Sequence, residues 1–168
     1  MSYTPFAVTR RLHLCHGSDP FLSRSDPVGR LVGMSAQHRG TLWKWMAVVI
    51  AAHLAVSVVH GSAHDGAHVT LSPAATFFVF AVILAGPLVG LALSWRNERL
   101  GSAIVAATMV GALVFGIVNH FVLHSPDHVS HVQAQWRLLF GTTAVLLAIT
   151  EMAGAGLAVL LIRERRLS

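Results

Sequence analysis

The chain has few charged residues and only one cysteine, and both shortages limit what it can be. Charged residues make up 11% of its 168 residues, whereas a typical soluble domain carries about 25%. Because Cys15 is the only cysteine, an intramolecular disulfide and a multi-cysteine metal site are both excluded. No hydrolase motif, phosphate-binding loop or redox cysteine pair is present. These absences argue against a soluble enzyme and favour a non-enzymatic protein.

Apolar residues are instead concentrated in four long blocks. The blocks cover residues 42–60, 74–95, 101–122 and 126–162. A helix needs about 20 apolar residues to cross the ~30 Å hydrocarbon core, and each block is long enough. Soluble helices would also need polar faces, which these blocks lack. We therefore predict an all-α membrane protein, an antiparallel bundle of four transmembrane helices within residues 42–163.

The basic residues indicate the orientation of these helices. Eleven of the twelve Lys and Arg residues precede or open the first block, separate the second from the third, or follow the fourth. Loops 61–73 and 123–135 contain none, and only Arg137 lies near them. The positive-inside rule then predicts cytoplasmic termini and extracytoplasmic loops in a multi-pass protein of the cell (inner) membrane. The net charge of +5 matches the anionic inner leaflet and requires no nucleic acid.

The two ends of the chain differ from the apolar blocks. Residues 1–41 are polar and Arg-rich and contain no apolar h-region, so they are unlike a cleaved signal peptide. We predict a mostly disordered cytoplasmic tail there and a short cytoplasmic C-terminus over 164–168. Met34 is an alternative start, because the residues that follow it would form a short leader into the first helix.

Prolines and serines indicate where several helices begin or bend. Ser72 and Pro73 fit the N-cap and first position of the second helix, and Ser125 and Pro126 fit the same positions in the fourth. Pro87 is expected to kink the second helix. We expect the helices to break beyond Gly61 and before Pro126.

Histidine is the abundant chemical group, with eleven in the chain. Antiparallel hairpins would bring both outer loops to the same side, and each loop combines imidazoles with a carboxylate. His-x3-His spacing places two imidazoles on one helical face, close enough to share a metal. The predicted metal site comprises His60, His64, His68, His120, His124, His128, His131, Asp65 and Asp127.

The ligand types narrow the cofactor and the function. Imidazole and carboxylate without thiolate favour a divalent transition metal, namely Zn, Cu, Ni, Co or non-haem Fe. Our first hypothesis is a metal-binding membrane protein for transport, delivery or sensing of that metal. One alternative is a haem-b electron-transfer subunit, in which only His60 and His120 lie at matched depths for axial ligation. The other is an accessory subunit whose histidines bind no cofactor. The expected partners are the bilayer and the metal ion, and a homo-oligomer or a larger membrane complex remains open.

Two polar residues lie where polarity is costly. His53 is at the centre of the first helix and Glu151 is near the centre of the fourth. A charged group at mid-bilayer costs about 2.5–3.5 kcal/mol on insertion scales. One interpretation is a proton relay from Glu151 through His53 to the outer histidines. The other is a neutral Glu151 that hydrogen-bonds to His53 or Asn119 for packing.

Overall fold

The computed structural model describes residues 27–167, with side chains over 37–164. This part is helical and contains no strand. Its elements are α1 (Pro27–Gly66), α2 (Pro73–Phe78), the π-helix η1 (Val79–Ala85), α3 (Gly86–Ser94), α4 (Glu98–Ile117), the π-helix η2 (Val118–Val122) and α5 (Ala134–Leu167). Four segments are long and apolar enough to span a membrane: Gln37–Gly66, Pro73–Ser94, Glu98–Val122 and Ala134–Glu164. The prediction of an all-α protein with four such helices is confirmed.

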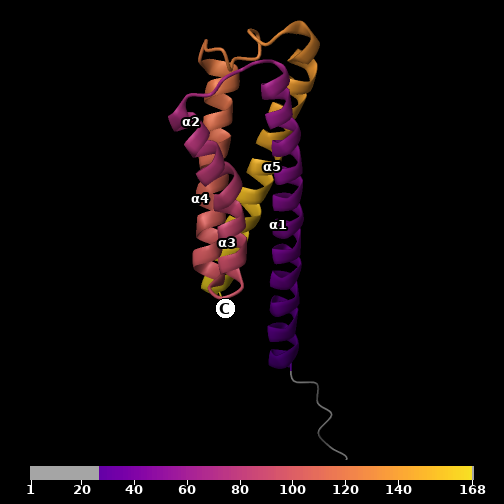
Figure 1. Cartoon of the computed structure of the whole chain (residues 1–168). Helices are drawn as coiled ribbons and strands as arrows, with labels where there is room; N and C mark the ends of the chain where they lie inside the picture. The colour runs from indigo at the N-terminus through magenta and orange to yellow at the C-terminus, as the bar shows by residue number, and fades with distance from the viewer. Residues whose placement is uncertain (1–26, 168) are drawn as a thin grey trace, which may run out of the picture.

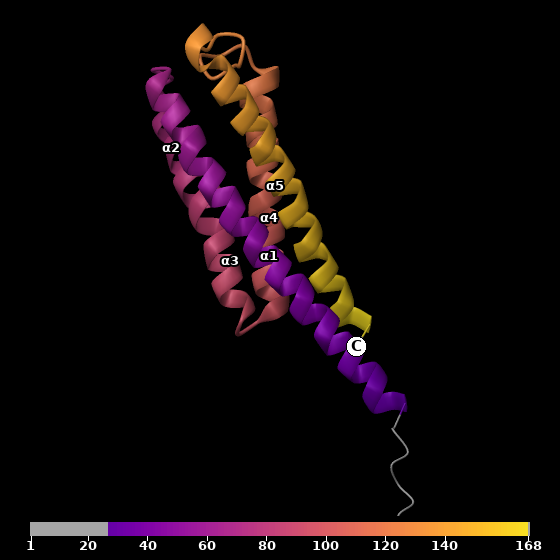
Figure 2. The ribbon, with the colours of Figure 1, turned by 90° about the vertical axis from the view of Figure 1, so that its right-hand side faces the viewer.

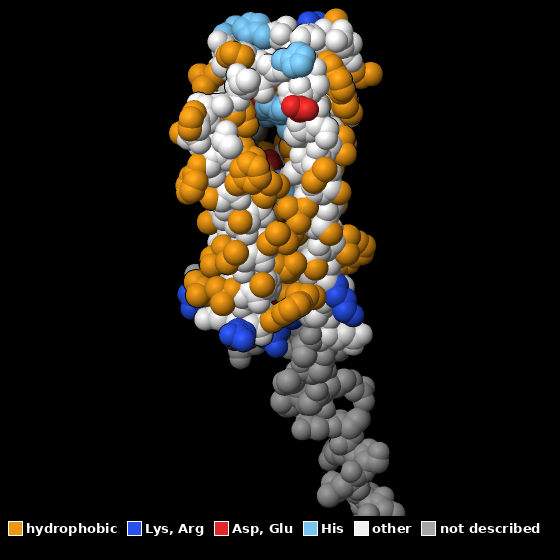
Figure 3. Space-filling model, viewed as in Figure 1, with side chains coloured by type: hydrophobic (Ala, Val, Ile, Leu, Met, Phe, Trp, Pro, Cys, Tyr) orange, Lys and Arg blue, Asp and Glu red, His pale blue; other side chains and the backbone are white. Residues whose placement is uncertain are grey.

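The connections between the four long helical segments lie alternately at the two ends of the molecule (Figure 1). Residues 67–72 and 123–133 lie at one end, which we call the loop end. The short turn between α3 and α4 and the C-terminus lie at the other end, which we call the turn end. α4 packs against α3 and α5, and α1 packs mainly against α5 (Figure 2). On the face shown in Figure 3, histidines gather at the loop end and most Lys and Arg side chains at the turn end.

The turn-end half has a dense apolar core. Met46, Ile50, Met109 and Leu161 are at most 1% exposed, and they belong to one cluster of packed side chains. The indole Nε1 of Trp43 donates a 2.7 Å hydrogen bond to the hydroxyl of Ser94, which ties α1 to α3. This half of the molecule is therefore closed by packed side chains.

α1 starts earlier and ends later than the predicted span. Residues 1–26 of the predicted tail lie outside the described part, but α1 is helical from Pro27, whose fixed φ suits a first helical position. The expected break beyond Gly61 is wrong, because α1 continues to Gly66. The helix ends where His68 adopts a positive φ of 55°. The amides of His68 and Val69 then bond to the carbonyls of Asp65 and His64, which is a Schellman cap.

The fourth long helix begins later than predicted. α5 starts at Ala134 and not at Pro126, so the Ser125–Pro126 pair does not open it. Side chains stabilise the preceding segment as a loop: Nδ1 of His131 lies 2.8 Å from the carbonyl oxygen of Ser125, and the guanidinium of Arg137 donates to the carbonyls of Ser130 and Val132. By contrast, Ser72 caps α2 as predicted, since its hydroxyl accepts from the amide of Ala75.

Candidate metal centre

Three histidines from two elements meet below the loop end. His60 and His64 lie one turn apart on α1, and His120 lies on η2. Each offers a ring nitrogen, and the three nitrogens lie within 4.8 Å of one another. His60 and His120 are 7% and 6% exposed. The ring of Phe140 contacts all three imidazoles, with centroid distances of 4.8–5.1 Å. We call this group the histidine trio.

The hydrogen-bond partners of His60 determine which of its nitrogens carries the proton. Its Nδ1 lies 2.8 Å from the hydroxyl oxygen of Thr143. That hydroxyl donates its own proton to the carbonyl of Leu139, at 2.7 Å. With its proton given to Leu139, the Thr143 oxygen can accept from Nδ1–H of His60. In the neutral imidazole with this tautomer, Nε2 has a lone pair.

His120 is held in the same way from the other side. Its Nδ1 lies 3.2 Å from the carbonyl oxygen of Asp127 and 3.4 Å from the carboxylate Oδ1 of the same residue. Both are acceptors, so Nδ1 carries the proton and Nε2 has the lone pair. The Nε2 atoms of His60 and His120 are 3.2 Å apart. Two lone pairs therefore face each other, and only a proton or a metal ion between them makes the contact favourable.

The distance between these two nitrogens suits a metal ion. Nitrogens bound at about 2.0–2.1 Å to a tetrahedral zinc ion lie roughly 3.3 Å apart. His64 adds a third donor, because one of its ring nitrogens lies within 4.8 Å of those of His60 and His120. Its Nε2 lies 3.3 Å from Oδ1 of Asp127. The trio therefore fits a divalent transition metal bound by three imidazoles.

Asp127 orients two members of the trio from outside. It is 6% exposed, and its Oδ1 faces Nδ1 of His120. This nitrogen lies on the opposite side of the imidazole ring from Nε2, the nitrogen that would bind the metal. Carboxylates in this position fix the tautomer and direction of a ligating imidazole. The sequence predicts Asp127 as a metal ligand near the start of the fourth helix. The structure instead places it in a loop, as a residue that positions His64 and His120.

Replacing Asp127 with asparagine is expected to weaken Zn(II) affinity by about 10- to 100-fold, the usual effect of losing such an outer partner. The amide keeps the size of the side chain but lacks the charge that orients both imidazoles. Titration calorimetry of the purified protein measures the change. Asp65→Asn, at the exposed end of α1, is the matched control. Equal losses in the two variants would contradict the orienting role.

The other predicted ligands are not part of the trio. His124, His128 and His131 form a separate group on the loop 123–133, with ring centroids 4.9–6.1 Å apart. Nδ1 of His128 bonds to Ser130, and Nδ1 of His131 bonds to the loop backbone. Asp65 and His68 are exposed at the end of α1. The single predicted site of nine residues is thus divided into the buried trio with Asp127 beside it and five side chains outside it, namely Asp65, His68, His124, His128 and His131.

The intramembrane polar residues are only partly brought together. Nδ1 of His53 lies 4.0 Å from Oε1 of Glu151 and 3.4 Å from the hydroxyl of Thr150. Nε2 of His53 lies 3.2 Å from the carbonyl oxygen of Ile83, to which it donates. Asn119 does not join this group, because its amide bonds to the carbonyl of Phe115 on its own helix.

Pro87 explains the contact between His53 and Ile83. A proline has no N–H to donate to the carbonyl four residues earlier, and in this helix that carbonyl belongs to Ile83. The π-helix η1 ends just before Pro87, so the expected disturbance of the second span appears as a widened turn. His53 supplies the missing donor from α1. This contact gives His53 a structural role.

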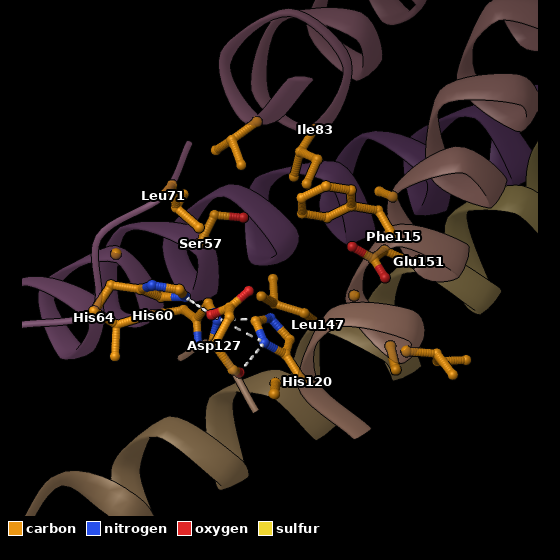
Figure 4. A pocket seen from close by; sticks show the side chains of 18 of the residues that line it. Ser57, His60, His64, Leu71, Ile83, Phe115, His120, Asp127, Leu147 and Glu151 are labelled. Carbon is orange, nitrogen blue, oxygen red and sulfur yellow. Dashed lines mark hydrogen bonds and ion pairs between the residues drawn. The ribbon is translucent and has the colours of Figure 1, made fainter. Parts of the chain in front are cut away.

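A cavity of about 370 Å³ extends from the trio towards Glu151. All three histidines and Asp127 line it, and Ile83, Phe115, Leu147 and Glu151 form its deeper wall (Figure 4). The sequence predicts neither this cavity nor the role of Thr143. Thr143 is 83 residues from His60, and no local pattern marks it as a partner.

Fold and site together define the class: a multi-pass membrane protein with a buried histidine cluster that could hold a metal ion. Comparison with known proteins adds no relative to this description. No family model, no curated protein and no solved structure matches the chain.

Proposed function

We propose that this chain is a membrane protein that binds one divalent transition metal ion through His60, His64 and His120. The observation that carries the proposal is the 3.2 Å approach of two Nε2 atoms, whose opposite ring nitrogens face the Thr143 hydroxyl and the Asp127 carbonyl. Zn(II), Cu(II), Ni(II), Co(II) and Fe(II) all accept such ligands.

The same geometry argues against haem b. Two axial histidines bind the iron from opposite faces of the porphyrin, so the macrocycle must lie between them. The rings of His60 and His120 are instead in edge contact, with centroids 4.9 Å apart. A cofactor-free accessory subunit is the other alternative. It leaves unexplained why three imidazoles from two elements converge with ring nitrogens within 4.8 Å of one another.

Among transport, delivery and sensing, we favour delivery or sensing. The cavity reaches Glu151, but the turn-end core around Met46, Ile50 and Met109 is packed closed. Transport would require this core to open, whereas reception of a metal from the loop end would not. Metal and lipid are therefore the partners that we propose, the lipid contacting the exposed apolar faces of the four spans.

The function is tested by titrating the purified protein with Zn(II) and Cu(II) at about pH 7.5. This pH lies above the reference pKa of about 6.5 of a histidine side chain, so the imidazole lone pairs are available to the metal. Affinity should be micromolar or tighter. A preparation that binds neither metal would contradict the proposal. A Soret band that disappears in His60→Ala would favour haem instead.

We further propose an antiparallel four-helix bundle with cytoplasmic termini and an extracytoplasmic loop end. Reporter fusions after Leu100 and after Ser168 are expected to report the cytoplasm. Fusions within 66–70 and near Ser130 are expected to report the opposite side. The positive-inside rule is the physical reason, since eleven basic residues lie on the side of the termini. A cytoplasmic signal from either loop would reverse the compartment from which the metal arrives.

A further inference from the structure

The trio leaves one position of a four-coordinate metal unfilled. Asp127 does not belong to the group of donor atoms that lie within 4.8 Å of one another, and its Oδ1 faces Nδ1 of His120. Metal sites with three protein ligands keep the fourth position for water or an exogenous ligand. All three histidines line the cavity, so this fourth position faces the cavity. The step rests on the proposed function, that is, on a metal being bound.

The cavity has a polar and an apolar side. The trio, Asp65, Asp127 and Glu151 supply the ionisable groups, from α1, η2, the loop 123–133 and α5. The wall formed by η1 carries Val79, Phe80 and Ile83 and has no polar side chain at these positions. Ligand pockets of about 300–1,000 Å³ with mostly apolar walls and a few polar groups typically hold small molecules. The volume of about 370 Å³ falls in this range.

The cavity also opens sideways. α1 packs mainly on α5 and touches α3 only sparsely, which leaves a gap beside α2 and η1. Figure 3 shows a hollow on this face, below the loop end, with an acidic side chain and histidine at its upper rim and apolar side chains below. Ser57 and Gly61 line the cavity from α1, and Thr76 and Phe80 line it from the opposite side. Both sides belong to segments apolar enough to span a membrane.

We propose that the cavity binds a single-chain amphiphile that enters from the bilayer. An oxygen donor of its head, such as a carboxylate or hydroxamate, occupies the fourth position of the metal. Its acyl chain lies along Val79, Phe80 and Ile83 and leaves between α1 and η1. The polar head of the amphiphile then lies on the polar side of the cavity, and its acyl chain lies on the apolar side.

The test uses Co(II)-loaded full-length protein in lipid nanodiscs, with acetohydroxamate and octanohydroxamate as probes and the visible spectrum of the metal as readout. Ser57→Phe and Ala148→Phe narrow the cavity from two different helices. Ser62→Phe and Ala153→Phe are the matched controls, because Ser62 and Ala153 are exposed and do not line the cavity. Ser57 and Ser62 both donate to carbonyls of their own helix, so the two changes remove similar bonds.

We expect octanohydroxamate to bind the unmodified protein and the controls at least about tenfold more tightly than acetohydroxamate, the effect of roughly two buried methylenes. Partitioning of the probe into the nanodisc lipid is the same for every variant, so it does not affect the comparison between variants. The difference should shrink in Ser57→Phe and Ala148→Phe while Co(II) affinity is kept. If both narrowed variants retain the full difference in affinity between the two probes, the acyl chain of octanohydroxamate does not occupy this cavity and the inference is wrong. Protein that binds no Co(II) at all would overturn the proposed function, and the inference with it.

Discussion

Alanine at His60 or at His120 is expected to weaken Zn(II) binding by at least about 100-fold, beyond the loss caused by removing an outer partner. Each replacement removes one of the two facing Nε2 donors, and the remaining pair of imidazoles cannot complete a closely held shell. Titration calorimetry of the purified protein at about pH 7.5, above the pKa of about 6.5 of free imidazole, measures the affinities.

His124→Ala is the matched control for this prediction. His124 belongs to the exposed loop group and contacts His128 and His131, so its loss should change Zn(II) affinity by less than about threefold, within the scatter of surface substitutions. Helical content and thermal unfolding of the metal-free variants show whether each one folds. A folded His60→Ala that binds zinc as tightly as His124→Ala would mean that the trio is not the site.

The number and approximate position of the four long helices could be predicted from the sequence, because they depend on local composition. Each span needs only a run of apolar residues of sufficient length, and such runs can be read without knowledge of neighbours. The pairing of His60 with His64 was also accessible, since i,i+4 spacing fixes a shared helical face. The N-cap at Ser72 was predicted from the adjacent residues Ser72 and Pro73, which is also a local pattern.

The remainder of the site depends on contacts that no local pattern encodes. Ser125–Pro126 has the chemistry of a helix start, but His131 and Arg137 bond to the loop backbone and delay the helix to Ala134. That delay leaves Asp127 free to turn inward towards His120. The role of His53 likewise depends on the carbonyl that Pro87 leaves unbonded 30 residues away from it. Of the seven histidines in the predicted metal site, tertiary contacts therefore bring only three together in the trio.

The close approach of α3 and α4 leads to the second large effect. A Cβ added at Gly101 would lie 2.3 Å from the backbone nitrogen of Ser94 and 2.5 Å from the carbonyl oxygen of Gly90. These are backbone atoms of the neighbouring helix, so a rotamer change cannot relieve the clash. The two helices would have to move apart, and the packing around Val105, which Gly90 also contacts, would be lost.

Gly101→Ala is therefore expected to lower the free energy of unfolding by roughly 3 kcal/mol, the upper range for overpacking a tight interface. Gly156→Ala is the matched control, because a Cβ at that helical position meets nothing within 4 Å. There the gain in helix propensity should stabilise the protein by up to about 1 kcal/mol. Unfolding of detergent-solubilised protein by increasing SDS measures both changes. Equal stability of the two variants would show that α3 and α4 do not approach as closely as the contact at Gly101 requires.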